Sequence, residues 1–160
     1  MSQTPPYLEL DLLFLKHFNG LIDDSLGAFE IMPGWAPLIW EVGQAVGQHQ
    51  GEAPGRPIHL VQVREKLGTL RIRLSGYTPE LLDLVEKLED RSATLCMYCG
   101  SSGQLELGIE ALTACPVCRA LRLDPRPAAV SELRQRIDHQ INRFLNHQAE
   151  LVASRTKSDD

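Results

Sequence analysis

The sequence lacks any long apolar run and is poor in aromatic residues. No uninterrupted apolar stretch approaches the roughly 20 residues that a membrane-spanning helix needs, and aromatic residues make up only 6% of the 160 residues. After Met1, residues 2–6 are polar or proline, without the basic segment that is typical of a secretory signal peptide. These absences predict a cytoplasmic protein that has no contact with a membrane.

Catalytic signatures are also missing. The sequence contains no nucleophile elbow, no phosphate-binding loop and no dinucleotide-binding fingerprint. Asp23 and Asp24 could act as general acid and base, but a turn or cap is the better interpretation because no positioned partner is evident. His139 and His147 are eight residues apart on one expected helix, a rise of about 12 Å that is too long for chelating one ion. We therefore expect a protein that is not an enzyme.

Charge is unevenly distributed along the chain. The formal net charge is -5, and the first 55 residues contain seven acidic residues and one basic residue. Residues 56–75 reverse this balance with five basic residues and one acidic residue. Nonspecific nucleic-acid binding depends on neutralising phosphates, so an acidic chain disfavours it overall. The basic segment is the candidate surface for a partner.

Four segments show the apolar spacing that is typical of amphipathic helices. They cover residues 8–20, 35–47, 78–93 and 128–153. In the first segment the apolar stripe consists of Leu8, Leu12, Leu15 and Phe18, widened by Leu13 and Phe14. The third segment begins with Thr78-Pro79-Glu80, which combines a capping residue, a proline in the first turn and an acidic residue near the positive end of the helix dipole.

Residues 58–74 change to the alternation that is typical of β-strands. Two alternating runs flank a turn at Gly68, which predicts an antiparallel hairpin with a positive φ at that glycine. The aliphatic face must pack on helices, because a lone hairpin is marginally stable in water. The opposite face carries the candidate partner-binding residues Arg64, Lys66, Arg71 and Arg73. They could meet an acidic protein or phosphates, or the acidic helix that follows could neutralise them.

All four cysteines lie within 23 residues, as the pairs Cys96-x2-Cys99 and Cys115-x2-Cys118 separated by fifteen residues. This spacing is typical of a zinc ribbon, in which four thiolates surround Zn²⁺. Iron in a rubredoxin-like site would use similar ligands, whereas two disulfides would suit a secreted protein. Four thiolates leave no open position for water or substrate, so the metal is expected to be structural and its binding to contribute to folding.

These patterns together predict an α+β fold. N-terminal helices pack on a β-hairpin, and a central helix, a four-cysteine zinc ribbon and a long C-terminal amphipathic helix follow. We expect a single domain over residues 1–125 with the ribbon at 94–120, the helix at 126–153 and a disordered tail at 154–160. The long helix could pack on the domain or form a dimer seam, and packing is the default because its stripe is short for an independent coiled coil.

The order of motifs resembles that of a group of small bacterial and prophage-associated zinc-ribbon proteins, and the resemblance covers residues 34–118. The shared features are Gly34-Trp35, the hairpin sequence Val61 to Arg71, Glu89, Ser92 and the two cysteine pairs, Cys96-x2-Cys99-Gly100 and Cys115-x2-Cys118. That group usually has lysine at position 64, an aromatic residue at 67 and another near 72–73. This chain departs from it with Arg64, Leu67, Ile72 and Arg73. The resemblance implies that hairpin, helix and cysteine turns form one unit, and it brings no known activity.

Two hypotheses of function follow. The first is a non-enzymatic, zinc-stabilised protein that binds another protein, as a toxin-neutralising immunity protein or a prophage accessory factor. The setting is an analogy with small accessory proteins that accompany phage or secreted-toxin loci. The second is a nucleic-acid-binding accessory or regulatory protein that uses the basic hairpin residues Arg64, Lys66, Arg71 and Arg73.

Overall fold

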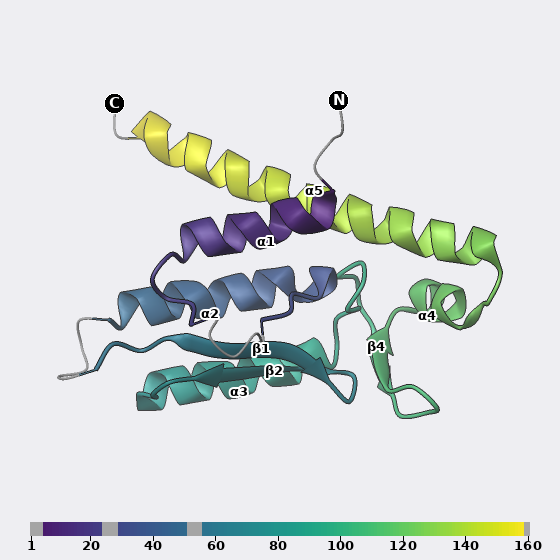
Figure 1. Ribbon diagram of the computed structural model, residues 1–160, viewed down its shortest axis with the longest axis horizontal. Coiled ribbons are helices and arrows are strands. Elements are labelled where there is room, and N and C mark those ends of the chain that lie inside the picture. The colour runs from purple at the N-terminus through teal and green to yellow at the C-terminus, as the bar shows by residue number, and fades with distance from the viewer. Residues whose placement is uncertain (1–4, 24–28, 51–55, 159–160) are drawn as a thin grey trace.

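A computed structural model of the chain describes residues 5–23, 29–50 and 56–158, in which helices are layered around a short β-hairpin (Figure 1). The elements in chain order are α1 (Pro6–His17), the 3-10 helix η1 (Pro33–Trp35), α2 (Ala36–Gln48), β1 (Leu60–Lys66), β2 (Thr69–Leu74), α3 (Pro79–Ser92), β3 (Gln104–Glu106), β4 (Leu112–Ala114), α4 (Pro116–Leu123) and α5 (Pro127–Ser158). The α+β fold predicted from the sequence is confirmed.

The hairpin forms as its sequence predicts. β1 and β2 pair antiparallel, with Arg64 opposite Arg71. The two turn residues, Leu67 and Gly68, have φ angles of 51° and 85°, which is the left-handed pair that a two-residue hairpin turn requires. The Glu65 carboxylate accepts a hydrogen bond from the Gly68 amide at 2.6 Å, which ties the turn together.

Both edges of this two-stranded sheet are covered. Alternate amides of β2 donate to side chains from α3 and the residues before it: Leu70 to Ser92 Oγ (2.9 Å), Ile72 to Glu89 Oε1 (3.0 Å) and Leu74 to the Tyr77 hydroxyl (3.0 Å). On the other side, Ile22 and Phe29 form parallel bridges with β1. Because unpaired strand edges invite pairing with other chains, the hairpin offers a partner its face rather than its edges.

The core lies between α2, the inner face of the hairpin and α3. The segment 35–47 is helical as expected, and one face of it is buried: Trp35, Leu38, Ile39, Val42 and Val46 are each at most 1% exposed. α3 begins where predicted, and the Thr78 hydroxyl accepts a hydrogen bond from the Leu81 amide at 3.2 Å. Its buried residues Leu81, Val85 and Leu88 pack toward this core.

α1 buries a different face from the stripe that the sequence predicts. Leu10 and Phe14 are fully buried, whereas Leu8, Leu12 and Leu15 are 47%, 53% and 43% exposed. The predicted stripe is correct for Phe14 and Phe18, which are buried, and wrong for the three leucines. The helix is apolar on two faces, and periodicity alone cannot choose between them.

Aromatic packing decides which face of α1 turns inward. The Phe14 ring lies 5.1 Å from that of Trp40 in an edge-on arrangement and 5.9 Å from that of Phe144 in a stacked one. Phe18 also packs edge-on against Trp40 at 4.8 Å. Aromatic contacts of this kind add to the area that each ring buries, so the phenylalanine face outcompetes the leucine face.

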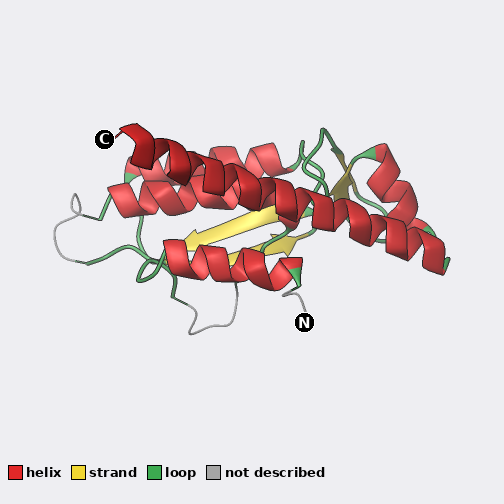
Figure 2. Cartoon of the chain, turned by 90° about the horizontal axis from the view of Figure 1, so that it is seen from above, coloured by secondary structure: helices red, strands yellow, loops and turns green. Residues whose placement is uncertain are grey.

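α5 packs on the body of the protein and runs along its length beside α1 (Figure 2). Leu133, Ile137, Ile141 and Phe144 of its predicted stripe are buried, but Val130 and Leu151 are 53% and 41% exposed. The helix extends to Ser158, past the expected end at 153. The hydroxyls of Ser154 and Thr156 donate to carbonyls of the preceding turn, and these bonds accompany the extra helical residues.

The region between the cysteine pairs forms two short strands, although the alternation of Leu105, Leu107 and Ile109 with polar residues is typical of one longer strand. β3 ends at Glu106, so Leu107 and Ile109 lie beyond it and are exposed. The helix α4 was not predicted, because its eight residues begin inside the second cysteine pair.

Within the described part of the chain, no helix has both the length and the apolar character to cross a bilayer.

Candidate metal centre

The first cysteine pair lies in a tight turn after α3. The Gly100 amide donates to the Cys96 carbonyl at 2.9 Å, and the Cys96 amide donates to the Ser101 carbonyl at 2.7 Å. Gly100 has a φ of 76°, which a side chain would strain. The Ser101 hydroxyl lies 2.9 Å from Cys99 Sγ. This turn points both thiols in one direction.

The second pair lies at the start of α4. Cys115 precedes the helix, and its sulfur accepts a hydrogen bond from the Cys118 amide at 3.3 Å. Pro116 occupies the first turn, where its missing amide costs nothing. An amide N–H that donates to a thiolate delocalises part of the negative charge on the sulfur. Hydrogen bonds of this kind commonly support metal ligands.

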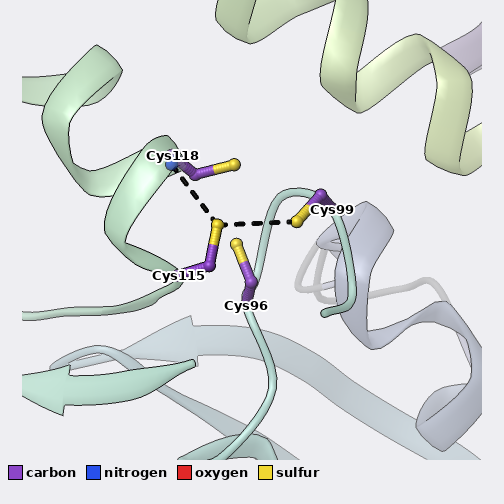
Figure 3. Close-up of side chains that lie close together, drawn as sticks. All are labelled: Cys96, Cys99, Cys115 and Cys118. Atoms are coloured by element: carbon purple, nitrogen blue, oxygen red, sulfur yellow. Dashed lines mark hydrogen bonds between the residues drawn. The ribbon is translucent and has the colours of Figure 1, made fainter. Parts of the chain in front are cut away.

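The four sulfur atoms converge on one point (Figure 3) and all lie within 4.8 Å of one another. Cys99 Sγ and Cys115 Sγ are 3.7 Å apart, and a tetrahedral zinc ion with bonds of about 2.3 Å would separate its sulfurs by about 3.8 Å. All four cysteines are free thiols. The predicted cluster is therefore confirmed as a group that can hold a metal ion such as zinc, and iron remains the alternative.

Cys96 and Cys118 interact strongly through their sulfurs. A hydrogen bond from the Cys118 thiol lowers the pKa of Cys96 to about 4, and the same bond raises the pKa of Cys118 above its ordinary value. Metal binding has to displace the remaining thiol protons, so affinity is expected to rise with pH.

Arg136 of α5 extends over the cysteine cluster. Its Nε lies 3.3 Å from Cys118 Sγ, and its Nη2 lies 3.8 Å from Cys99 Sγ and 4.0 Å from Cys115 Sγ. Zinc with four thiolates carries a net charge of -2, and a nearby guanidinium offsets half of it. The hydrogen bond to Cys118 also holds the pKa of Arg136 above its ordinary value.

Two more polar residues attach α5 to the first cysteine turn. Gln140 is 4% exposed and its amide donates to the Pro33 carbonyl at 3.4 Å. Arg143 donates to the Cys99 carbonyl at 3.3 Å and also to the Gln140 side chain. Sequence reasoning missed Arg136, Gln140 and Arg143, although their spacing of four and three residues places them along one side of the buried stripe of α5.

The cysteine turns are joined to the rest of the fold at Gly34 and Trp35. The Gly34 amide donates to the Met97 carbonyl at 2.9 Å, and a Cβ at position 34 would lie 1.8 Å from the Cys96 carbonyl oxygen. Only glycine permits this approach. The Trp35 indole donates to the Leu95 carbonyl at 3.0 Å.

The hairpin turn is joined to the ribbon as well. Thr113 of β4 is fully buried, and its hydroxyl donates to the Gly68 carbonyl at 2.7 Å. A Cβ at position 68 would lie 2.9 Å from the Ala111 carbonyl carbon. Hairpin, α3 and cysteine turns therefore form one packed unit.

The candidate partner-binding residues lie apart from the cysteines, on the outer face of the hairpin. The register places Arg64 opposite Arg71, Lys66 opposite Thr69 and Gln62 opposite Arg73, so all four cations share one face, and each is exposed. Arg71 pairs with Glu89 of α3 at 3.5 Å. Among the residues that the structure describes, the other three have no ion pair. The acidic helix thus neutralises one cation of the four.

The other candidate residues from the sequence form no site. The Asp23 amide donates to the Leu60 carbonyl at 2.9 Å, beside β1, and Asp24 lies outside the described residues. His139 and His147 are exposed on α5. Over residues 5–23, 29–50 and 56–158, the cysteines are the single cluster of potential metal ligands.

Comparison with known proteins finds no family model, no curated protein and no solved structure that matches the chain. No family is therefore identified. The resemblance to small bacterial and prophage-associated zinc-ribbon proteins stays a prediction.

Proposed function

We propose that the chain is a non-enzymatic, zinc-stabilised binding protein whose outer hairpin face binds an acidic surface of another protein. The observation that carries this proposal is the set of exposed cations at Arg64, Lys66 and Arg73, which no ion pair neutralises within the described part of the chain. Like charges on neighbouring strands repel one another. A complementary anionic surface relieves that repulsion and attracts its partner over a distance.

An acidic protein suits this face better than a nucleic acid does. The outer face consists of Gln62, Arg64, Lys66, Thr69, Arg71 and Arg73. It contains no aromatic ring on which a base could stack, whereas proteins that bind single strands generally supply such rings. A phosphate backbone continues its negative charge past the immediate contact, where the net charge of -5 repels it, whereas a protein partner needs only one local acidic patch.

The four-cysteine site supports a structural rather than a catalytic role for the metal. Cys96, Cys115 and Cys118 are buried and Cys99 is half-buried. Four thiolates complete the tetrahedral shell of zinc, so no position is open for a substrate or an activated water. The metal would hold the ribbon against Gly34 and the hairpin turn.

The biological setting that we propose is neutralisation of a toxin, as an immunity protein, or an accessory role in a prophage. It rests on the sequence resemblance, and the identity of the protein partner tests it. A partner that inhibits growth when expressed alone, and that is harmless when expressed with this chain, would support it. A partner without toxicity, encoded far from phage or toxin genes, would contradict it.

A pull-down compares two double variants that change the net charge of the chain by the same amount. The test variant is Arg64→Glu with Arg73→Glu, and the control is Arg134→Glu with Lys157→Glu on the exposed side of α5. We expect wild type and control to retain an acidic protein from a lysate of the native host, and the test variant to lose it while its melting temperature stays unchanged. Equal retention by both variants contradicts the proposal.

Binding to nucleic acid is measured in parallel. A gel shift with duplex or single-stranded DNA or RNA at low salt that is abolished in the test variant alone would indicate that the hairpin face binds a nucleic acid and not a protein. No shift at low salt is the result that we expect.

A further inference from the structure

α1 presents an unpartnered apolar stripe on its outer side. Leu8, Leu12 and Leu15 are spaced by four and three residues, so they lie on one helix face, and they are 47%, 53% and 43% exposed. Figure 2 shows α1 along one long side of the molecule, with α5 on its inner flank. Contiguous exposed apolar patches on soluble proteins mark interaction sites.

The charges beside this stripe are self-complementary. Glu9 lies in the first turn of α1 and Lys16 in the last. At about 100° per residue, both lie on the same flank of the stripe, about 80–100° around the helix from Leu8. Neither has an ion pair among the described residues. An antiparallel pairing of two such helices brings each glutamate beside the lysine of the other copy.

We infer that this stripe is the seam of a homodimer in which the α1 helices of two copies pack antiparallel. A two-fold axis near Leu12 places Leu8 of one copy opposite Leu15 of the other, and both Leu12 side chains at the centre. Two Glu9–Lys16 pairs then flank the seam. In each pair, Glu9 of one copy and Lys16 of the other differ in height along the helix axis by about one residue. This inference does not depend on the proposed function, since the hairpin cations take no part in it.

The seam is expected to be weak. Three leucines per copy bury less surface than a stable interface needs. Asp11 lies on the other flank of the stripe, and its two copies would approach each other near the two-fold axis, where their charges repel. We therefore expect a dimer that dissociates on dilution and that Asp11→Asn tightens.

Sedimentation velocity of the full-length, zinc-loaded chain over a concentration series tests the inference. Wild type should shift from monomer to dimer as concentration rises. Leu12→Glu should stay monomeric at every concentration, while the control Leu107→Glu, at a side chain that is 78% exposed on the ribbon, should dimerise like wild type.

A charge exchange distinguishes this seam from any other apolar contact. Glu9→Lys and Lys16→Glu should each weaken the dimer, because every flanking pair becomes repulsive. The double variant restores both pairs and should dimerise like wild type, and an equimolar mixture of the two single variants should form a heterodimer. Circular dichroism checks that α1 stays helical in each.

Three results would overturn the inference. One is a wild type that stays monomeric at the highest concentration. Another is a dimer that Leu12→Glu leaves intact. The third is a double variant that dimerises no better than the single variants.

Discussion

The hairpin body (α1, α2, β1, β2 and α3) and the cysteine region (residues 95–126) are stabilised in different ways. The body buries large side chains such as Trp35, Phe14 and Leu70 completely. The cysteine region has strands of three residues. It buries Met97, Tyr98 and Leu112 but leaves Leu107 and Ile109 exposed. A segment this small cannot bury enough apolar surface to fold alone. We propose that metal ligation by the four cysteines adds the stability that the small apolar core of this region does not supply.

α5 connects the two regions. Ile141 and Phe144 pack into the core of the body, while Arg136 and Arg143 contact the cysteine turns. One helix thus uses apolar contacts toward the body and charged contacts toward the metal centre. Each type of contact can be removed separately, which makes the comparison testable.

The largest expected effect is that of Leu81→Ala in the body. Leu81 is fully buried, so its truncation should lower the free energy of unfolding by about 2–5 kcal/mol. Urea unfolding measures this loss, and metal analysis should show unchanged zinc per chain in the folded protein. Loss of the metal from the folded variant would mean that the body and the cysteine region are not stabilised independently.

Arg136→Met tests the charged contact to the metal centre. The variant keeps much of the side-chain volume but leaves the thiolates without their guanidinium. Removing a group that supports metal ligands commonly weakens affinity about 10–100-fold, and competition with a chromogenic chelator measures it. Arg134→Met is the matched control on the same helix, and it should bind zinc like wild type. Equal affinities for both variants would contradict the role of Arg136.

Thr113→Val is expected to have the smallest effect of the three, at the junction between the regions. It leaves the buried Gly68 carbonyl without its hydroxyl donor, and an unsatisfied buried group costs about 1–3 kcal/mol. Urea unfolding of the zinc-loaded protein should show that loss. A variant as stable as wild type would show that this hydrogen bond does not couple hairpin and ribbon.

Local patterns with a single physical solution were predictable from the sequence. The positive φ at Gly68, the Thr78 cap and the convergence of the four cysteines were each predicted, and each is found. Features that depend on competition between contacts were not. α1 has two apolar faces, and only the rings of Trp40 and Phe144, distant in sequence, select the phenylalanine side.

The supporting residues of the metal centre were also beyond local patterns. Arg136 is 18 residues beyond the last cysteine, on a helix whose path is set by Ile141 and Phe144 packing on the body. Nothing in the sequence indicates that this helix passes over the thiolates. α4 was not predicted because a segment of eight residues, four of them a candidate ligand or next to one, shows too few apolar positions for a helical period.

Hydrogen exchange of the full chain, with and without a zinc chelator, shows which amides are protected by the metal and which by the apolar core. We predict that removing the metal abolishes amide protection over the cysteine region, including the Met97 amide that donates to Thr113, while β1, β2 and α3 keep theirs. Protection that is unchanged in the cysteine region, or lost to the same extent in both regions, would contradict the claim that metal and apolar core stabilise different parts of this protein.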